Sequence, residues 1–354
     1  MKLPVLSAFS CLYFIAQICL FCHCHSVKSD RHIPNNRCFY YWKSDFALTP
    51  NQIESLNQNG ITRLYVKFFD VDWEEKLQRP VPVAPVTFTT LPPEQIKMIP
   101  VVYLTNNTLV QISADEIQFL ADSIFQKILA LMPVKSKVPP EIQIDCDWTG
   151  STKDKYFQLL TALKQKLTPK QTLLSSTLRL HQVKFSHQTG IPPVDRVTLM
   201  FYNMGDFKHP DTENSILDLQ TAQKYLGKLS EYPLPVDVAL PLFSWGVVFR
   251  NGRYSNLIAN LNSAEADTMK QILEARGNNH YLALKSTMIN GSSVGKGDMI
   301  RIEEAGVNQC KKAAQMLTSY LPVMDTMQVI LFHLDRHIFE QNPNSRISDI
   351  YDSF

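Results

Sequence analysis

Cysteine is scarce outside the first residues of this chain. Of its seven cysteines, four precede residue 25, and only three are spread over the remainder: Cys38, Cys146 and Cys310. Three scattered cysteines do not form a disulfide framework, and they are too far apart for a Cys-x-x-Cys zinc pair. We therefore expect them to be buried as small apolar side chains, and we expect neither a metal site nor a cofactor.

The chain also lacks an excess of charge of either sign. It has 35 basic and 33 acidic residues, interspersed along the sequence, for a formal net charge of +2. Without a block of like charges, nucleic acid and an anionic membrane surface are not expected partners. The glycine-rich stretch at 291–298 lacks the spacing of a phosphate-binding loop, so we interpret it as a turn.

What the chain does contain is a repeated alternation of strand-like and helix-like segments. Its 45% hydrophobic and 19% charged residues are typical of a folded globular protein. Amphipathic segments separate eight apolar, β-branched or aromatic runs, at 38–42, 63–73, 99–105, 141–148, 172–180, 196–203, 236–245 and 327–335. This order predicts an α/β fold with a parallel sheet, and eight strands predict a closed (β/α)₈ TIM barrel.

The spacing between the seventh and eighth strands is too long for one crossover helix. It contains a helical pattern at 263–277 and strand-like runs near 281–288 and 298–304. We therefore expect a small α+β insertion at 246–304. The predicted barrel covers residues 36–340, and residues 341–354 are left as a C-terminal tail.

Residues 1–25 have the profile of a leader. After Lys2 comes an uncharged, mostly apolar run to Cys22, followed by a polar segment. This pattern predicts a secretory signal, a lipoprotein signal with a lipid-modified cysteine, or an uncleaved membrane anchor. We expect an exported protein of the periplasm or cell envelope, in contact with a membrane only through this leader or its lipid.

Two strand ends carry paired carboxylates. KFFDVDWE at 67–74 contains Asp70, Asp72 and Glu74, and IQIDCDWT at 142–149 contains Asp145 and Asp147. Alternate residues of a strand point to the same face, and active groups of a barrel lie at the carboxyl ends of its strands. Buried carboxylates are unfavourable unless they are paired or functional. A polar functional cleft is one interpretation, and a buried structural network is the other.

The segments IDCDWT (144–149) and MFYN (200–203), with the long insertion, resemble family 18 glycoside hydrolases, the chitinase and endoglycosidase group. The resemblance implies that Asp145 and Asp147 correspond to the last two aspartates of the family's catalytic motif. It also implies that Tyr202 corresponds to the tyrosine that steadies the substrate's acetamido group.

The chain departs from the family at several motif positions. Thr149 replaces the catalytic glutamate, Ile142 the first aspartate and Asn203 the aspartate after the tyrosine. In its FYYW, FFDVDW and LMFYN segments, and in the absence of the catalytic glutamate, the chain is more similar to an uncharacterised group of exported or lipoprotein-like bacterial barrels. If it is an enzyme, Asp72 or Glu74 is the candidate for the missing acid.

Further residues at strand ends suit a sugar-binding cleft. Aromatic rings there stack on pyranose rings, and polar groups bind hydroxyls. The candidate substrate-binding residues are Asp70, Trp42, Arg179, Asn203, Trp245 and Asp335. Rim packing is the alternative role of the aromatic residues, and neutralising Asp145 or Asp147 is the alternative role of Arg179.

These observations predict an exported, carbohydrate-active barrel that binds a glycan or oligosaccharide and could hydrolyse it. Two other hypotheses stay open. One is a non-catalytic, lectin-like barrel that has lost its acid. The other is a cell-envelope scaffold protein whose acidic residues are structural.

Overall fold

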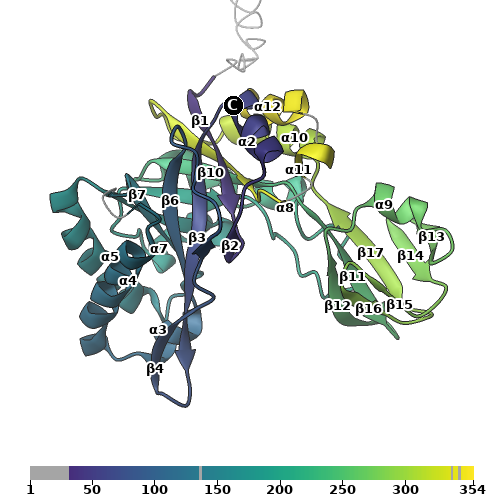
Figure 1. Ribbon diagram of the computed structural model, residues 1–354, viewed down its shortest axis with the longest axis horizontal. Coiled ribbons are helices and arrows are strands. Elements are labelled where there is room, and N and C mark those ends of the chain that lie inside the picture. Colours follow the sequence, from purple (N-terminus) through teal and green to yellow (C-terminus); the bar gives the residue numbers. More distant parts are fainter. Residues whose placement is uncertain (1–31, 135–137, 336–337, 342–343) are drawn as a thin grey trace, which may run out of the picture. The chain divides into compact units, whose positions relative to one another are not determined.

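The computed structural model describes residues 32–134, 138–335, 338–341 and 344–354. The leader predicted at 1–25 lies outside these residues. Eight parallel strands close into a barrel (Figure 1), in which the first strand pairs with both the second and the eighth. They are β1 (Asn35–Tyr41), β3 (Ile61–Glu74), β6 (Lys97–Leu104), β7 (Glu141–Asp145), β8 (Leu173–Arg179), β9 (Arg196–Met200), β10 (Val236–Pro241) and β18 (Met327–Phe332). The predicted (β/α)₈ barrel is confirmed.

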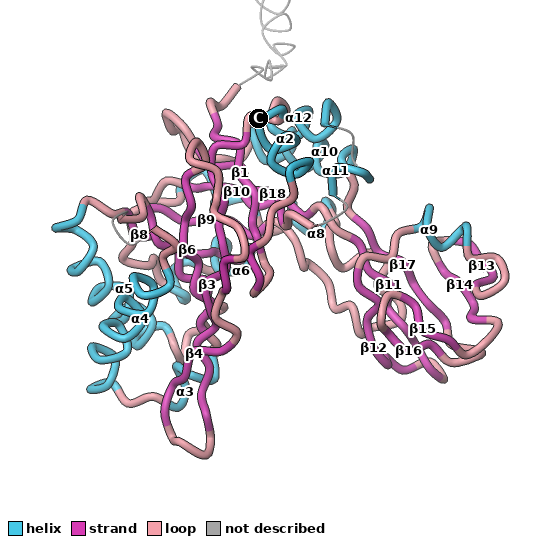
Figure 2. Tube along the Cα trace, viewed as in Figure 1, coloured by secondary structure: helices cyan, strands magenta, loops and turns pink. Residues whose placement is uncertain are grey.

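Helices and short connecting elements surround the barrel (Figure 2). The helices of the barrel are α2 (Pro50–Gln58), α3 (Asn106–Gln111), α4 (Ile117–Leu131), α5 (Lys153–Leu167), α6 (Leu180–Lys184), α7 (Ser186–Thr189), α8 (Leu219–Gln223) and α10 (Val307–Thr318). Three 3₁₀ turns accompany them, namely η2 (Ala114–Glu116), η3 (Thr168–Lys170) and η4 (Leu226–Glu231). Short strands β2 (Asp45–Phe46) and β5 (Thr87–Phe88) pair with each other, and β4 (Arg79–Val83) pairs with the end of β3.

The inside of the barrel is polar at its amino-terminal end. Glu141 accepts hydrogen bonds from Ser175 (2.6 Å) and Tyr65 (3.3 Å), and Asp237 forms an ion pair with Arg196 (2.5 Å). Burial raises the pKa of Asp237 to about 7, against the effect of Arg196. These paired charges fill the barrel floor, in keeping with the rule that buried charges need partners.

A β-bulge in β3 controls which side chains enter the barrel. The register to β6 shifts between Lys67 and Phe69, so Lys67 lies opposite Val101 and Asp70 opposite Tyr103. Phe68 and Phe69 are consecutive residues, yet both are buried in the core outside the barrel. Lys67 and Asp70 can therefore form an ion pair of 3.0 Å within one strand, which regular alternation would prevent.

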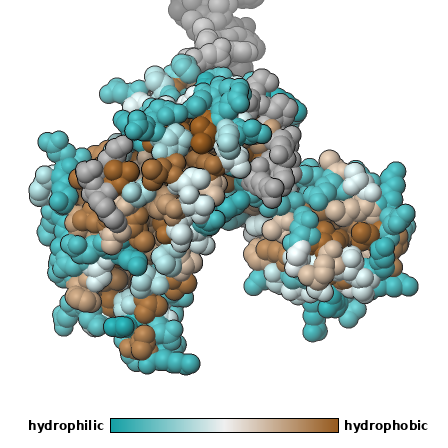
Figure 3. All heavy atoms as spheres, viewed as in Figure 1, coloured by the Kyte–Doolittle hydropathy of each residue, from teal (hydrophilic) through white to brown (hydrophobic). Residues whose placement is uncertain are grey.

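Between β10 and β18 the chain forms a five-stranded antiparallel sheet with its own apolar core. Its elements are β11 (Ser244–Arg250), β12 (Arg253–Ala259), α9 (Ser263–Thr268), β13 (Leu273–Gly277), β14 (His280–Ala283) and β17 (Met299–Glu304), with the hairpin of β15 (Thr287–Ile289) and β16 (Ser292–Val294). In Figure 3 apolar side chains gather in the middle of its visible face and hydrophilic ones surround them. The helix is shorter than the predicted 263–277, because residues 273–277 pair with β14.

Within the predicted C-terminal tail, the structure shows a helix that packs against the core. After α11 (Ile338–Gln341), helix α12 (Asn344–Tyr351) buries Ile347, Ile350 and Tyr351. The Tyr351 hydroxyl donates to the backbone oxygen of Cys38 (2.8 Å), and Ile33 N donates to Phe354 O (2.7 Å). The amphipathic spacing of these apolar residues is that of a docked helix. None of the described helices is long and apolar enough to cross a membrane.

A fully buried ion pair joins the insertion to the loop after β9. Arg301 and Glu303 on β17 both have 0% exposed side chains and lie 2.6 Å apart. Arg301 donates to the backbone oxygens of Phe207, His209 and Pro210, while Glu303 accepts from Ser215 N (2.9 Å). Each of these donors and acceptors has a partner within the group. The loop after β9 is therefore bonded to β17 at several residues.

Removing Arg301 should be strongly destabilising, because Glu303 would stay buried without its cation. Arg301→Met is expected to lower the free energy of unfolding by about 3–5 kcal/mol. Urea denaturation would measure it, with Arg276→Met as the control. Arg276 pairs with Glu274 on the same sheet, but both side chains are 47% exposed, and the expected loss is below about 1 kcal/mol. Equal losses in the two variants would contradict the role of the buried pair.

Candidate functional site

The two aspartates at the end of β7 have different surroundings. Asp145 is 6% exposed and accepts a hydrogen bond from Thr177 on β8 (2.7 Å). Burial raises the pKa of Asp145 to about 6, with Asp147 and Asp70 adding to the rise and Thr177 and Arg179 opposing it. Asp145 is thus a carboxyl group held below the rim, in a position where its charge is disfavoured.

Asp147 lies nearer the rim and is held by Arg179, the last residue of β8. Arg179 Nε donates to Asp147 Oδ1 (2.5 Å) and Nη2 donates to Oδ2 (3.0 Å). This is a two-point, charge-assisted contact in which both carboxylate oxygens are engaged. Burial disfavours the charged guanidinium, but the bonds to Asp147 outweigh it and raise the pKa of Arg179 above its ordinary value. The neutralising role considered for Arg179 is therefore present, and it acts directly on Asp147.

Thr149 is exposed and belongs to the turn that precedes α5. Its backbone N–H donates to Thr152 Oγ1 (3.0 Å), and its hydroxyl contacts the hydroxyl of Ser151 (2.9 Å). Trp148, between Asp147 and Thr149, is buried on the helix side, where its indole stacks on Tyr156 and donates to Thr189 O (3.0 Å). A hydroxyl that is part of a surface turn provides no general acid at this position.

Tyr202 follows β9 and is part of an aromatic cluster inside the barrel mouth. Its ring lies 5.3 Å from that of Phe332 and 6.3 Å from that of Phe243, and its hydroxyl donates to Met200 Sδ (3.4 Å). Burial raises the pKa of Tyr202 well above its ordinary value. The hydroxyl is protonated at neutral pH, and its one hydrogen points to the sulfur of Met200.

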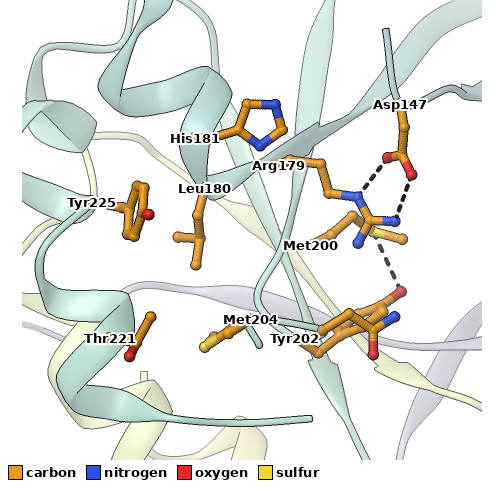
Figure 4. A pocket seen from close by; sticks show the side chains of 10 residues that line it. Asp147, Arg179, Leu180, His181, Met200, Tyr202, Met204, Thr221 and Tyr225 are labelled. Atoms are coloured by element: carbon orange, nitrogen blue, oxygen red, sulfur yellow. Dashed lines mark hydrogen bonds and ion pairs between the residues drawn. The ribbon is translucent and has the colours of Figure 1, made fainter. Parts of the chain in front are cut away.

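These residues surround a pocket of about 360 Å³. Asp147, Arg179, Tyr202 and Asn203 line it, so the structure brings four of the predicted site residues together. Figure 4 shows the Arg179 guanidinium between Asp147 and Tyr202, with the Tyr225 ring at the opposite wall. The pocket has the size of ligand sites, which are roughly 300–1,000 Å³.

The acidic residues of β3 are engaged in other contacts. Asp70 pairs with Lys67, and Asp72 Oδ1 accepts from Thr105 Oγ1 (2.8 Å) and from Trp73 N (2.9 Å). Glu74 lies in the hairpin with β4, where its carboxylate accepts from Lys76 N (3.2 Å). None of the three lines the pocket beside Asp147. Their role as replacement acids stays a prediction, without a contact in this structure that favours it.

The remaining predicted contacts are dispersed. Trp42 packs on the rings of Tyr40 and Phe332 inside the barrel. Trp245 is on the insertion, where its indole donates to Glu303 Oε2 (3.0 Å). Asp335 forms an ion pair with Lys43 (2.8 Å) and lines a different cavity.

Sequence reasoning missed several residues of the site. Tyr103 ends the inward row of β6 and lies beside both Asp70 and Asp145 in the strand register, and burial raises its pKa. Its alternation with Val101 was a signal that could have identified it. His181 and Tyr225 line the pocket from helices and loops, and no pattern in the sequence marks them. No cluster of three or more metal-ligating residues occurs in the described part of the chain.

Known proteins share this fold but little sequence. No family model and no curated protein matches the chain. The spore cortex-lytic enzyme SleL of Bacillus megaterium superposes with a TM-score of 0.56 at 13% identity, over 91% of this chain and 75% of that one. A chitinase from Chromobacterium violaceum gives 0.51 at 12% identity, over 89% and 98%. A GH18 chitinase mutant from Cycas revoluta, in complex with (GlcNAc)₄, gives 0.50 at 10% identity, over 90% and 98%.

These similarities show that the chain has the TIM-barrel fold of the family 18 chitinases and of SleL. The resemblance drawn from IDCDWT and MFYN is confirmed at the level of fold. Identities of 10–13% carry no residue roles, so the assignments at this site rest on the geometry above.

The surroundings of Asp145 predict a measurable pH dependence of stability. Its folded pKa of about 6 exceeds the unfolded value of about 3.9, so the folded state is favoured while the carboxyl is protonated. The stability it contributes is present below about pH 4 and is lost as the pH rises through about 6, by about 3 kcal/mol. Asp145→Asn should therefore remove this loss and be more stable than the native protein at pH 7.

Chemical denaturation between pH 4 and pH 8 would measure this difference. Asp211→Asn is the matched control, because the side chain of Asp211 is 89% exposed. A native and an Asp145→Asn protein with the same pH dependence would contradict the assigned surroundings of Asp145.

Proposed function

We propose that this protein is an exported glycan-binding barrel that holds a sugar in the pocket beside Asp147 and does not cleave it. The observation that carries the proposal is the pairing of Asp147 with Arg179 through both carboxylate oxygens. The pair supplies donors and acceptors for hydroxyl groups, and Tyr202 and Asn203 add polar contacts at the same wall. Tyr225 provides an aromatic ring opposite the polar wall.

Hydrolysis of a glycosidic bond needs a carboxyl group that protonates the leaving oxygen, together with either a second carboxylate or, in the substrate-assisted enzymes, a group of the substrate itself. In the pocket, Asp147 is the acidic residue, and it is neutralised by a cation. Asp145 has a raised pKa suitable for an acid, but it lies beneath the rim and does not line the pocket. The place two residues after Asp147 is occupied by Thr149, whose hydroxyl is part of a turn. These features favour binding over catalysis.

The pocket and the similar fold of the chitinase in complex with (GlcNAc)₄ support one class of glycan. A neutral N-acetylglucosamine oligosaccharide suits a pocket whose two charges cancel. The predicted leader would deliver the protein to the cell envelope. The scaffold hypothesis requires no sugar contact at all, and the absence of binding would favour it.

The affinity for (GlcNAc)₄ should depend on Tyr225, and the bound sugar should stay uncleaved. Tyr225→Ala is expected to weaken (GlcNAc)₄ binding by about tenfold, the effect of losing one stacking contact of about 1.4 kcal/mol. Isothermal titration calorimetry would measure it, and mass spectrometry of the same samples would look for cleaved sugar. Tyr320→Phe, which changes a partly buried tyrosine outside the pocket, is the control.

Cleavage of (GlcNAc)₄ by the native chain would contradict the non-catalytic part of the proposal. Absence of binding to (GlcNAc)₄ and to a wider glycan array would contradict the carbohydrate part. Equal affinity of the native protein and Tyr225→Ala would place the ligand outside this pocket.

A further inference from the structure

A second cavity lies where the insertion meets the end of the barrel. It has a volume of about 460 Å³ and shares no lining residue with the pocket beside Asp147. Its walls come from the segment between β10 and β11, from the insertion and from the segment after β18. The ring of Phe243 lines this cavity and lies 5.7 Å from the ring of Phe332 in the aromatic cluster of the barrel mouth.

The polar lining of this cavity is rich in acceptors. Asn260 donates its amide hydrogen to Asp335 Oδ2 (2.7 Å), and Asn290 donates to the backbone oxygens of Ala259 (3.2 Å) and Asn260 (3.3 Å). With their amide nitrogens used in this way, both asparagines offer oxygen atoms to a ligand. Such a lining suits a ligand with many hydrogen-bond donors.

The charge of the lining is negative. Asp335 is neutralised by Lys43 at 2.8 Å. Glu265, in the first turn of α9, forms no ion pair with any residue that the structure describes, so its charge is uncompensated there. Burial lowers the pKa of His333, which keeps its ring neutral at neutral pH, and its buried Nδ1 has no hydrogen-bond partner among the described residues. A ligand with a positive charge would pair with Glu265, and its hydrogen-bond donors would suit the neutral His333 ring.

We propose that this second cavity binds a sugar unit with a free ammonium group, such as glucosamine, and that Glu265 pairs with the ammonium. The hydroxyls of the sugar would donate to the amide oxygens of Asn260 and Asn290. Phe243 offers an aromatic ring for the apolar face of the pyranose. This inference rests on the lining of the second cavity alone, so it stands or falls separately from glycan binding beside Asp147.

Calorimetry with the chitosan tetramer (GlcN)₄ tests this site, with (GlcNAc)₄ as the N-acetylated probe. Glu265→Gln removes the charge without changing the size of the side chain, and it is expected to weaken (GlcN)₄ binding at least about tenfold. Ala259→Lys places a cation in the cavity from an exposed position and should weaken the same binding. Neither change should alter the affinity for (GlcNAc)₄.

Glu274→Gln is the matched control, because Glu274 is a solvent-exposed acid on β13 outside the cavity. It should bind (GlcN)₄ like the native chain. Circular dichroism melting checks that each variant is folded. If Glu265→Gln does not fold, Ala259→Lys still tests the site.

Four results would overturn the site, and the first three concern the native chain, the cavity variants and the control. The native chain does not bind (GlcN)₄, or both cavity variants bind it with native affinity, or Glu274→Gln weakens binding as much as Glu265→Gln does. Loss of (GlcN)₄ binding in Tyr225→Ala alone would also overturn it, because the amino sugar would then occupy the first pocket.

Discussion

The chemistry at the mouth of this barrel depends on the ion pair between Asp147 and Arg179. It joins the ends of β7 and β8, engages both oxygens of the carboxylate and removes its net charge. The same guanidinium opposes the rise in the pKa of Asp145 below it. A carboxylate with both oxygens engaged in this way is held in one orientation.

The pocket also depends on a second, more distant ion pair. Asn203 and Met204 line the pocket, and their backbone N–H groups donate to Ile216 O and Ser215 O across the following loop. Ser215 in turn donates to Glu303, which is held by Arg301. The wall of the pocket formed by Asn203 and Met204 is thus hydrogen-bonded to the insertion through Ser215 and the buried Glu303–Arg301 pair. A buried, fully satisfied network rigidifies its surroundings, so we expect the insertion to restrain this wall.

The chain shares its fold with chitinases, and the residues at its barrel mouth are its own. The fold supplies eight strand ends that converge on one face, and function on such a fold is decided by the residues placed there. Here Arg179 pairs with Asp147, and Thr149 is part of the turn that precedes α5. The second cavity adds an acceptor-rich surface beside the aromatic cluster, with a different charge from the first pocket.

Some of this could be predicted from the sequence, because it depends on local periodicity. All eight barrel strands follow from apolar runs separated by amphipathic segments, and each was identified within a few residues of its place. The grouping of Asp147, Arg179, Tyr202 and Asn203 follows too, since parallel strands present their carboxyl ends to one face. The residue types at these ends were enough to indicate a polar cleft.

The tertiary structure alone decided how these groups are used, because partners distant in sequence determine charge and exposure. The bulge at Phe68 turned Lys67 and Asp70 to the same side, where they neutralise each other. Helix α12, in the segment predicted as a tail, buries its apolar face, and its Tyr351 hydroxyl donates to Cys38 O on β1. His181 and Tyr225 reached the pocket from helices and loops that no strand pattern reveals. Sequence periodicity determines elements, whereas pairing across the fold determines which carboxylates remain available to a ligand.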